Sequence, residues 1–154
     1  MTEFSEIGAP TTELPAKHVA GAVLVSRTGR LLLQLRDDDP NIDNPGLIGI
    51  FGGHREDADD GPLACARREI LEETGYCVPR DGFEFLAQCV TDHPRFRTCA
   101  TLYLVRHVPE RSLTITEGAL FTIEPGQLEP HWRRMSAVAI LAVRIALDRL
   151  RDAA

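Results

Sequence analysis

The sequence predicts a single α/β domain, and three features of its 154 residues support this prediction. Two short runs rich in Val and Leu near the start flank a glycine-containing turn, which is typical of a β-hairpin. A run of helix-forming residues lies between Pro62 and Gly75, and a longer apolar helix pattern occupies the last part of the chain. Further strand-like segments lie between these two helix patterns. A chain of this length is long enough for one packed core and short for two.

The first part of the chain predicts a flexible lead-in followed by a hairpin. Residues 1–15 are mostly polar and contain proline, so we expect a flexible lead-in to a domain that covers residues 16–154. The apolar runs HVAGAVLVS (18–26) and RLLLQLR (30–36) are predicted as two strands. Gly29 lies between them and supplies the backbone freedom that a tight turn requires.

A third strand and a helix are predicted next. LIGIFGG (47–53) has the composition of a strand that ends in a pair of glycines. PLACARREILEET (62–74) is predicted as a helix, and its proline suits the first helical position, where the missing N–H costs nothing. Asp60 or Gly61 precedes this helix as its cap, and Gly75 follows it where a left-handed residue is expected.

Three strands and a second helix complete the predicted fold. FEFLAQCVTDH (83–93) and TCATLYLVRHV (98–108) are strand-like and joined by a short turn, and SLTITEGALFTIE (112–124) contains further alternating apolar residues. HWRRMSAVAILAVRIALDRLRD (131–152) is predicted as a long helix. Its nearly continuous apolar stretch must be buried, either in the core or against a second copy of the chain, so a homodimer is one expectation.

The charge balance is acidic, with 23 Asp and Glu against 17 Lys and Arg and a formal net charge of −6. Non-specific nucleic-acid binding depends on clustered Lys and Arg, so this balance argues against a nucleic-acid partner. An acidic protein that acts on an anionic substrate needs a cation between the two.

The sequence also predicts a cytoplasmic protein without membrane contact. The N-terminus lacks a basic start followed by an apolar run, which a signal peptide requires. The longest apolar stretch, residues 135–147, is too short to span a bilayer and contains an arginine. Four cysteines without an export signal are expected to be reduced thiols.

Three glutamates of the first predicted helix gather on one side of it. At about 100° per residue, Glu69, Glu72 and Glu73 fall within an arc of roughly 100°. Like charges at this spacing repel each other by a few tenths of a kcal/mol per pair. One interpretation is a solvated acidic face. The other is a divalent cation held by carboxylate oxygens, and Mg²⁺ bound in this way also binds phosphate oxygens.

The residues around this cluster resemble a family signature. FGGHREDADDGPLACARREILEETGY resembles the box of the Nudix hydrolase family, Gly-x5-Glu-x7-Arg-Glu-U-x-Glu-Glu-x-Gly-U, where U is aliphatic. The positions that match in register are Arg68, Glu69, Ile70, Glu72, Glu73 and Gly75, with Tyr76 at the last apolar position. The box covers residues 52–76.

The first half of the box departs from the family pattern. Counting back from Arg68 places Asp60 at the expected glutamate and His54 at the opening glycine. One inserted residue between Gly53 and Asp60 restores the alignment. Alternatively the extra residue follows Asp59, which then takes the acidic role. The spacing leaves both aspartates open.

The resemblance implies a fold and an activity. The fold is an α/β/α sandwich with a mixed β-sheet between helices. The activity is hydrolysis of the pyrophosphate bond in a nucleoside diphosphate linked to another moiety, such as a nucleotide sugar, ADP-ribose or a dinucleotide. The implied cofactor is Mg²⁺ or Mn²⁺, and the implied partner is this small-molecule substrate.

The resemblance also implies roles for individual residues. The metal ligands are the carboxylates of Glu69, Glu72 and Glu73 and the carbonyl of Gly53. Arg68 orients this cluster by a charge-assisted contact.

The general base and the substrate-binding residues are less closely defined. The base is either Glu69 or Glu117, which is similar to a downstream acid of the family and has a surface turn as its alternative role. Arg36 ends a strand beside the loop that borders the expected pocket, and Arg55 follows the glycine pair. Both are candidate phosphate-binding residues, with a solvated loop charge as the alternative for Arg55.

Two other functions stay open at this point. The altered first half of the box is consistent with a non-catalytic Nudix domain that binds a nucleotide and regulates a partner. An RNA 5′-end pyrophosphohydrolase is the second alternative, although the acidic charge and the lack of a basic tract argue against it.

Overall fold

The computed structural model describes residues 14–153, so residues 1–13 of the predicted lead-in lie outside it. The strands are β1 (Ala16–Ser26), β2 (Leu31–Leu35), β3 (Ile48–Gly49), β4 (Phe51–His54), β5 (Glu84–His93), β6 (Phe96–Val108) and β7 (Ala119–Ile123). The α-helices are α1 (Gly61–Thr74) and α2 (Ala137–Asp152). Short 3₁₀ helices lie at Arg80–Gly82, Glu110–Ser112, Pro125–Gln127 and Glu129–Arg134.

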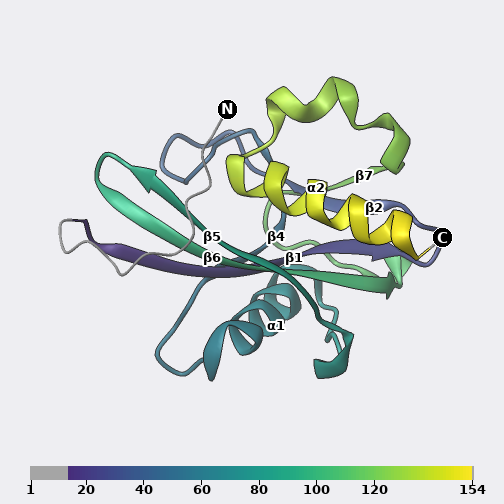
Figure 1. Ribbon diagram of the computed structural model, residues 1–154, viewed down its shortest axis with the longest axis horizontal. Coiled ribbons are helices and arrows are strands. Elements are labelled where there is room, and N and C mark those ends of the chain that lie inside the picture. Colours follow the sequence, from purple (N-terminus) through teal and green to yellow (C-terminus); the bar gives the residue numbers. More distant parts are fainter. Residues whose placement is uncertain (1–13, 154) are drawn as a thin grey trace.

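The strands of the described range form one mixed sheet of seven strands. Neighbouring strands follow the order β3–β2–β1–β6–β5, with β4 paired to β1 and β7 paired to β2. β1 and β6 are parallel, and the other pairs are antiparallel. α1 and α2 cover opposite faces of this sheet (Figure 1), which confirms the predicted α/β/α sandwich.

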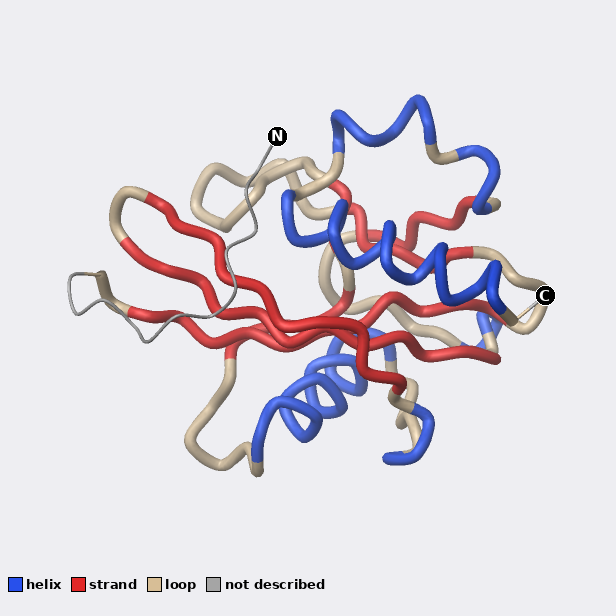
Figure 2. The backbone as a smooth tube through the Cα atoms, in the orientation of Figure 1, coloured by secondary structure: helices blue, strands red, loops and turns tan. Residues whose placement is uncertain are grey.

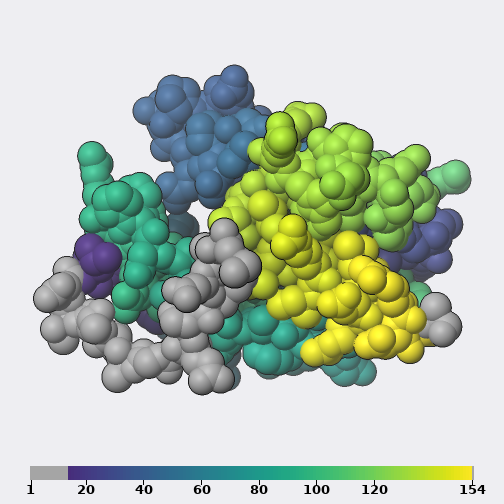
Figure 3. All heavy atoms as spheres, turned by 45° about the horizontal axis from the view of Figure 1, so that its top comes forward, coloured from purple at the N-terminus to yellow at the C-terminus, as the bar shows by residue number. Residues whose placement is uncertain are grey.

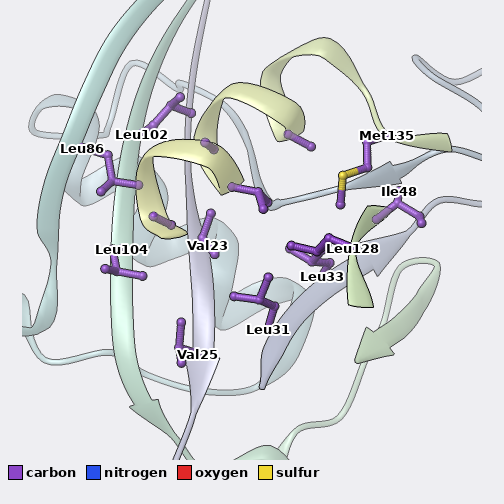
Figure 4. Close-up of a cluster of buried hydrophobic side chains, with 14 of the residues drawn as sticks. Val23, Val25, Leu31, Leu33, Ile48, Leu86, Leu102, Leu104, Leu128 and Met135 are labelled. Carbon is purple, nitrogen blue, oxygen red and sulfur yellow. The ribbon is translucent and has the colours of Figure 1, made fainter. Parts of the chain in front are cut away.

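β1 is buried on both faces over its second half, and this explains its nearly unbroken apolar run. Successive side chains of a strand point to opposite faces. Val23 therefore packs into the core under α2, whereas Ala22 and Leu24 pack into the core against α1. Figure 4 shows the core on the α2 side, where Val23 and Leu102 of the adjacent strand β6 lie beneath the helix.

The predicted hairpin of residues 18–36 is confirmed, and the two strand-like segments joined by a short turn form a second hairpin. β1 and β2 pair antiparallel, and Gly29 makes the turn with φ at +86° and its N–H donating to the Ser26 carbonyl at 3.0 Å. β5 and β6 pair antiparallel over most of their length. Their connected ends extend beyond the start of α2 (Figure 2).

The predicted single strand 47–53 is wrong, because the structure divides this segment at Ile50. β3 pairs with β2 opposite Leu35, whereas β4 pairs with β1 and places Gly52 opposite Gly21. The segment therefore leaves one neighbouring strand and joins another. This crossing brings the glycine pair to the centre of the sheet.

The predicted start of the second helix is also wrong. α2 begins at Ala137, and residues 131–134 belong to the 3₁₀ helix Glu129–Arg134. Ser136 is extended and caps α2 by accepting the Ala139 N–H at 3.2 Å, while its own N–H donates to the Ile48 carbonyl at 3.0 Å. Within residues 14–153, neither α-helix combines the length and the hydropathy needed to cross a membrane.

Candidate active site

α1 holds its acidic residues against β4. Cys65, Ala66 and Ile70 are buried at helical spacing in the core between α1 and the sheet. The Glu69 carboxylate then lies directly against the backbone of Gly53, where a Cβ atom would be only 2.5 Å from Glu69 Cδ. A glycine at this position is therefore required for the carboxylate to approach the strand.

Glu73 is buried one helical turn further along α1. Its carboxylate accepts hydrogen bonds from the Gly52 N–H at 2.9 Å and from Gln34 Nε2 at 2.7 Å. Burial, together with the nearby charges of Glu117 and Glu69, raises the pKa of Glu73 to about 8, although these two hydrogen bonds act to lower it. The three carboxyl groups therefore lie close enough to repel one another.

The segment before β7 caps the C-terminus of α1 and is not part of the strand predicted at 112–124. Thr114 N–H donates to the Thr74 carbonyl at 2.9 Å, and Thr116 N–H donates to the Glu73 carbonyl at 3.0 Å. The last carbonyls of a helix have no partner within the helix and need such donors. The N–H groups that bind these carbonyls are not available for strand pairing, so β7 starts only at Ala119.

The same segment places Glu117 beside the α1 carboxylates. Gly118 turns the chain into β7 with φ at +66°, and a Cβ atom there would meet the Leu35 carbonyl oxygen at 2.3 Å. Gln34 Nε2 also donates to the Glu117 carbonyl at 3.0 Å. Glu117 and Glu69 consequently line the same cleft. The Glu117 backbone is thus held by Gln34, while the residue is exposed at the cleft.

The cleft has a volume of about 950 Å³ and extends well beyond the carboxylates. Its walls are the segment between β2 and β3, the β5–β6 hairpin and the start of α2, which lie together on the face shown in Figure 3. Arg36 lines it, with Nε donating to the Asp43 carbonyl at 2.7 Å. Arg55 lies outside this cleft and lines two smaller cavities.

The carboxylates fit a hard divalent cation by their chemistry. Within residues 14–153, no three His, Cys, Asp or Glu side chains form a ready-made metal site. However, burial raises the pKa of Glu69, and the neighbouring charges of Glu72 and Glu117 add to this effect. A divalent cation would replace that repulsion with coordination by oxygen. Because Glu69 lies against Gly53, the backbone carbonyl of Gly53 is close to the carboxylates. This carbonyl oxygen already has one neighbour, Cys65 Sγ, at 3.5 Å.

A family model described as the NUDIX domain matches residues 16–145. The chain belongs to the Nudix family. Nudix hydrolase 3 of Arabidopsis thaliana is 41% identical over an alignment of 78 residues, with 48% of this chain and 10% of that relative covered. The chain thus spans about a tenth of the length of the curated relative that it matches.

Solved structures share the Nudix fold at low sequence identity. The MutT protein from Methanosarcina mazei Go1 has a TM-score of 0.73 and 17% identity, with 92% of this chain and 99% of that chain covered. The NUDIX domain of Shewanella oneidensis NrtR, solved in complex with ADP ribose, has a TM-score of 0.69 and 16% identity, with 91% and 90% covered. At such identities the likeness concerns the fold.

Of the two adjacent aspartates before α1, Arg68 of the Nudix box contacts Asp59. Its Nε and one of its terminal nitrogens each lie 2.9 Å from a carboxylate oxygen of Asp59, whereas Asp60 is exposed. The hydrogen bond from Arg68, with a second from the Glu56 N–H, holds the pKa of Asp59 well below its usual range. Arg68 also donates to Glu69 at 3.0 Å. Arg68 therefore links the preceding loop to the acidic cluster.

The remaining predicted ligand lies at the edge of the site. Glu72 accepts a hydrogen bond from Arg68 at 3.2 Å, and its side chain is 57% exposed. It is not among the residues that line the cleft. The structure thus brings Glu69, Glu73 and Glu117 together and leaves Glu72 nearer to solvent.

Gln34 is a contributor that the sequence analysis missed. It is only 2% exposed and joins the Glu73 carboxylate to the Glu117 carbonyl through the same Nε2 atom. Its Oε1 atom is buried without a partner among the described residues. One signal was present in the sequence, since this glutamine is the single polar residue inside the apolar run LLLQL.

The raised pKa of Glu73 gives a prediction about stability. The folded protein binds the Glu73 proton more tightly than the unfolded chain, whose pKa is near 4.5. This group therefore favours folding below pH 4.5, and its contribution is lost as the pH rises toward 8. Relative to Glu73→Gln, which does not titrate, we expect wild-type stability to fall between pH 5 and pH 8.5.

Urea unfolding of both proteins in EDTA at the two pH values measures this difference. Glu124→Gln is the matched control, because Glu124 is exposed on another part of the surface. Equal stability differences between wild type and Glu73→Gln at pH 5 and pH 8.5 would contradict the prediction.

Proposed function

We propose that this Nudix chain hydrolyses the pyrophosphate bond of a nucleoside diphosphate linked to a second moiety. The observation that carries the proposal is the meeting of Glu69 and Glu73 of α1 with Glu117 of a separate segment beside Gly52 and Gly53. Glu69 and Glu117 line a cleft large enough for a small-molecule ligand, and Glu73 is buried beside them.

Mg²⁺ or Mn²⁺ is the cofactor of the proposed reaction. Its ligands are drawn from the Glu69, Glu72, Glu73 and Glu117 carboxylates and the Gly53 carbonyl. When bound, the cation supplies positive charge for the diphosphate oxygens and lowers the pKa of a coordinated water molecule.

The protein side chains supply the proton transfer and the positioning. Glu69 and Glu117 line the cleft, and either accepts the proton of the attacking water. Burial raises the pKa of Glu69, which makes its carboxylate a stronger base than an ordinary exposed carboxylate. Arg68 positions Glu69, and Arg36, which also lines the cleft, binds a phosphate group.

The proposed substrates are small molecules. The net charge of −6 disfavours a nucleic-acid polyanion as substrate. The NrtR domain solved with ADP ribose shares this fold, which supports including ADP-ribose among the first compounds tested.

The test is a substrate panel measured with Mg²⁺, with Mn²⁺ and with EDTA. The panel contains nucleotide sugars, ADP-ribose, dinucleoside polyphosphates, nucleoside triphosphates and triphosphorylated RNA. We expect release of a mononucleotide from a nucleoside diphosphate derivative, abolished by EDTA. Turnover that EDTA does not affect would contradict the proposal. Tight nucleotide binding without any turnover would instead favour the regulatory alternative.

A further inference from the structure

The main cleft continues along the sheet beyond the carboxylates. α2 covers the sheet over Val23 and Leu102, and the start of α2 forms one wall of the cleft. Past this point β1, β5 and β6 extend further (Figure 1). Lys17 and Val19 of β1 line this extension, and Thr98 of β6 is the register partner of Lys17. Among residues 14–153, no helix covers the part of the sheet that lines the outer cleft.

Three side chains in contact, Lys17, Phe96 and His93, line the outer end of the cleft. Lys17 Nζ lies 3.7 Å from the centroid of the Phe96 ring. The Phe96 ring in turn stacks on the His93 ring, with centroids 4.5 Å apart and planes 19° from parallel. All three residues line the cleft. A cation over an aromatic face is attracted by the ring, so Phe96 holds the Lys17 ammonium in place.

Lys17 is the only lysine in the sequence, and the other cationic side chains are all arginines. Among the described residues, no carboxylate lies within 4.0 Å of Lys17 Nζ, whereas Arg68 of the same protein forms several ion pairs. An ammonium is a compact charge with three donors, suited to an anion approaching from open space. The outer cleft thus presents a positive charge that forms no ion pair with a carboxylate of residues 14–153.

The position of this charge relates it to the proposed reaction. Lys17 precedes Ala20 by three residues on β1, and Ala20 is the register partner of Gly53, on which Glu69 lies. Three residues of a strand span about 10 Å. A substrate whose diphosphate lies at Gly53 therefore reaches Lys17 only with the part beyond the diphosphate.

We propose that the Lys17 end of the cleft is a subsite for an anionic group, a phosphoryl or a carboxylate, on that outer part of the substrate. This inference rests on the proposed function. The stack favours an anion over a nucleobase, because Lys17 and His93 occupy the two sides of the Phe96 ring. The groups available to a ligand are therefore the Lys17 ammonium and the His93 imidazole, and both donate hydrogen bonds to anions.

The test compares ligands that differ by one anionic group. The pairs are UDP-glucose with UDP-glucuronic acid, which adds a carboxylate, and ADP-ribose with its 2′-phosphate, which adds a phosphoryl group. Dissociation constants are measured by calorimetry in EDTA, where no metal-dependent turnover consumes the ligand. We expect the anionic member of at least one pair to bind about tenfold more tightly, as for a charge-assisted hydrogen bond. The pair that shows the preference identifies the source of the anion.

Variants connect this preference to Lys17. Lys17→Met keeps an apolar stem over Phe96 and removes the charge, so the affinity ratio is expected to fall to about one, whereas Lys17→Arg retains part of it. Arg80→Met is the matched control, because Arg80 is exposed and outside the cleft, and it should retain the wild-type ratio.

A second measurement does not depend on any variant. Reductive methylation with ¹³C labels a single lysine side chain besides the N-terminal amine and keeps its positive charge. The Lys17 signal is expected to shift with the anionic member of the pair and not with the neutral member.

Equal affinities within both pairs, no measurable binding of either pair, or a preference that survives in Lys17→Met would overturn the subsite. These outcomes are separate from failure of the proposed function, which is judged by metal-dependent turnover of the substrate panel. A protein that hydrolyses its substrate without preference for the anionic member would keep the function and lose the subsite.

Discussion

Glu69→Gln is expected to lower kcat by about 10²- to 10⁴-fold, the range for loss of a positioned acid–base group. The substitution keeps the shape of the side chain beside Gly53 and removes its charge. Folding should be little affected, because Arg68 keeps its two contacts with Asp59. Steady-state rates on the substrate found in the panel, together with melting temperatures, measure the two effects separately.

Mn²⁺ binding followed by electron paramagnetic resonance then distinguishes the two roles of Glu69. A loss of both kcat and Mn²⁺ affinity assigns it as a metal ligand, whereas a loss of kcat alone assigns it as the base. Glu124→Gln is the control for removal of one carboxylate, since Glu124 is 56% exposed and pairs with Arg30 outside the cleft. A variant at Glu69 with wild-type kcat would contradict the proposed site.

The part of the site that the sequence predicted is the part built by local spacing. Glu69 and Glu73 lie one turn apart on a helix whose ends were set by a proline and by Gly75, which adopts φ at +73° as expected. Helical geometry alone puts such residues on one side. Their relation to Gly53 was implied only by the family resemblance, and the structure places the Glu69 carboxylate against Gly53.

Glu117 required tertiary information. Its position depends on Thr114 and Thr116, which cap α1, and the sequence pattern of this segment instead suggested an alternating strand. The alternation of side chains in this segment predicts strand pairing. It does not show that the backbone N–H groups of Thr114 and Thr116 bind instead to the unpaired carbonyls at the end of α1. Gln34 was missed for a related reason, because its partners are separated from it by 39 and 83 residues.

The choice between Asp59 and Asp60 depended on the path of the loop. Asp59 accepts the Glu56 N–H at 2.9 Å, and its carbonyl accepts the Gly61 N–H at 3.0 Å. This compact turn points the Asp59 side chain at Arg68 and leaves Asp60 outside. Residue counting alone does not reveal which of two adjacent side chains a turn directs inward.

Gly52→Ala is expected to destabilise the fold by about 3 kcal/mol, the upper part of the range for inserting an atom into a packed interior. At Gly52 a Cβ atom would lie 2.3 Å from the Ala20 carbonyl oxygen and 2.5 Å from Gly21 Cα. Both are backbone atoms of β1 and have no rotamer to relieve the contact, so β4 would have to move away. A protein of this size would lose about 6–12 °C in melting temperature.

Gly126→Ala is the control, because nothing lies within 4 Å of a Cβ atom at that exposed position. Gly53→Ala provides a second comparison, since the atoms nearest to its Cβ would be those of the Glu69 carboxylate, which is the end of a flexible side chain. We therefore expect Gly52→Ala to lose stability and activity together, and Gly53→Ala to lose activity with a much smaller change in stability. Thermal and urea unfolding measure both, and a Gly52→Ala protein as stable as Gly126→Ala would contradict the close packing of β1 against β4 from which the site is built.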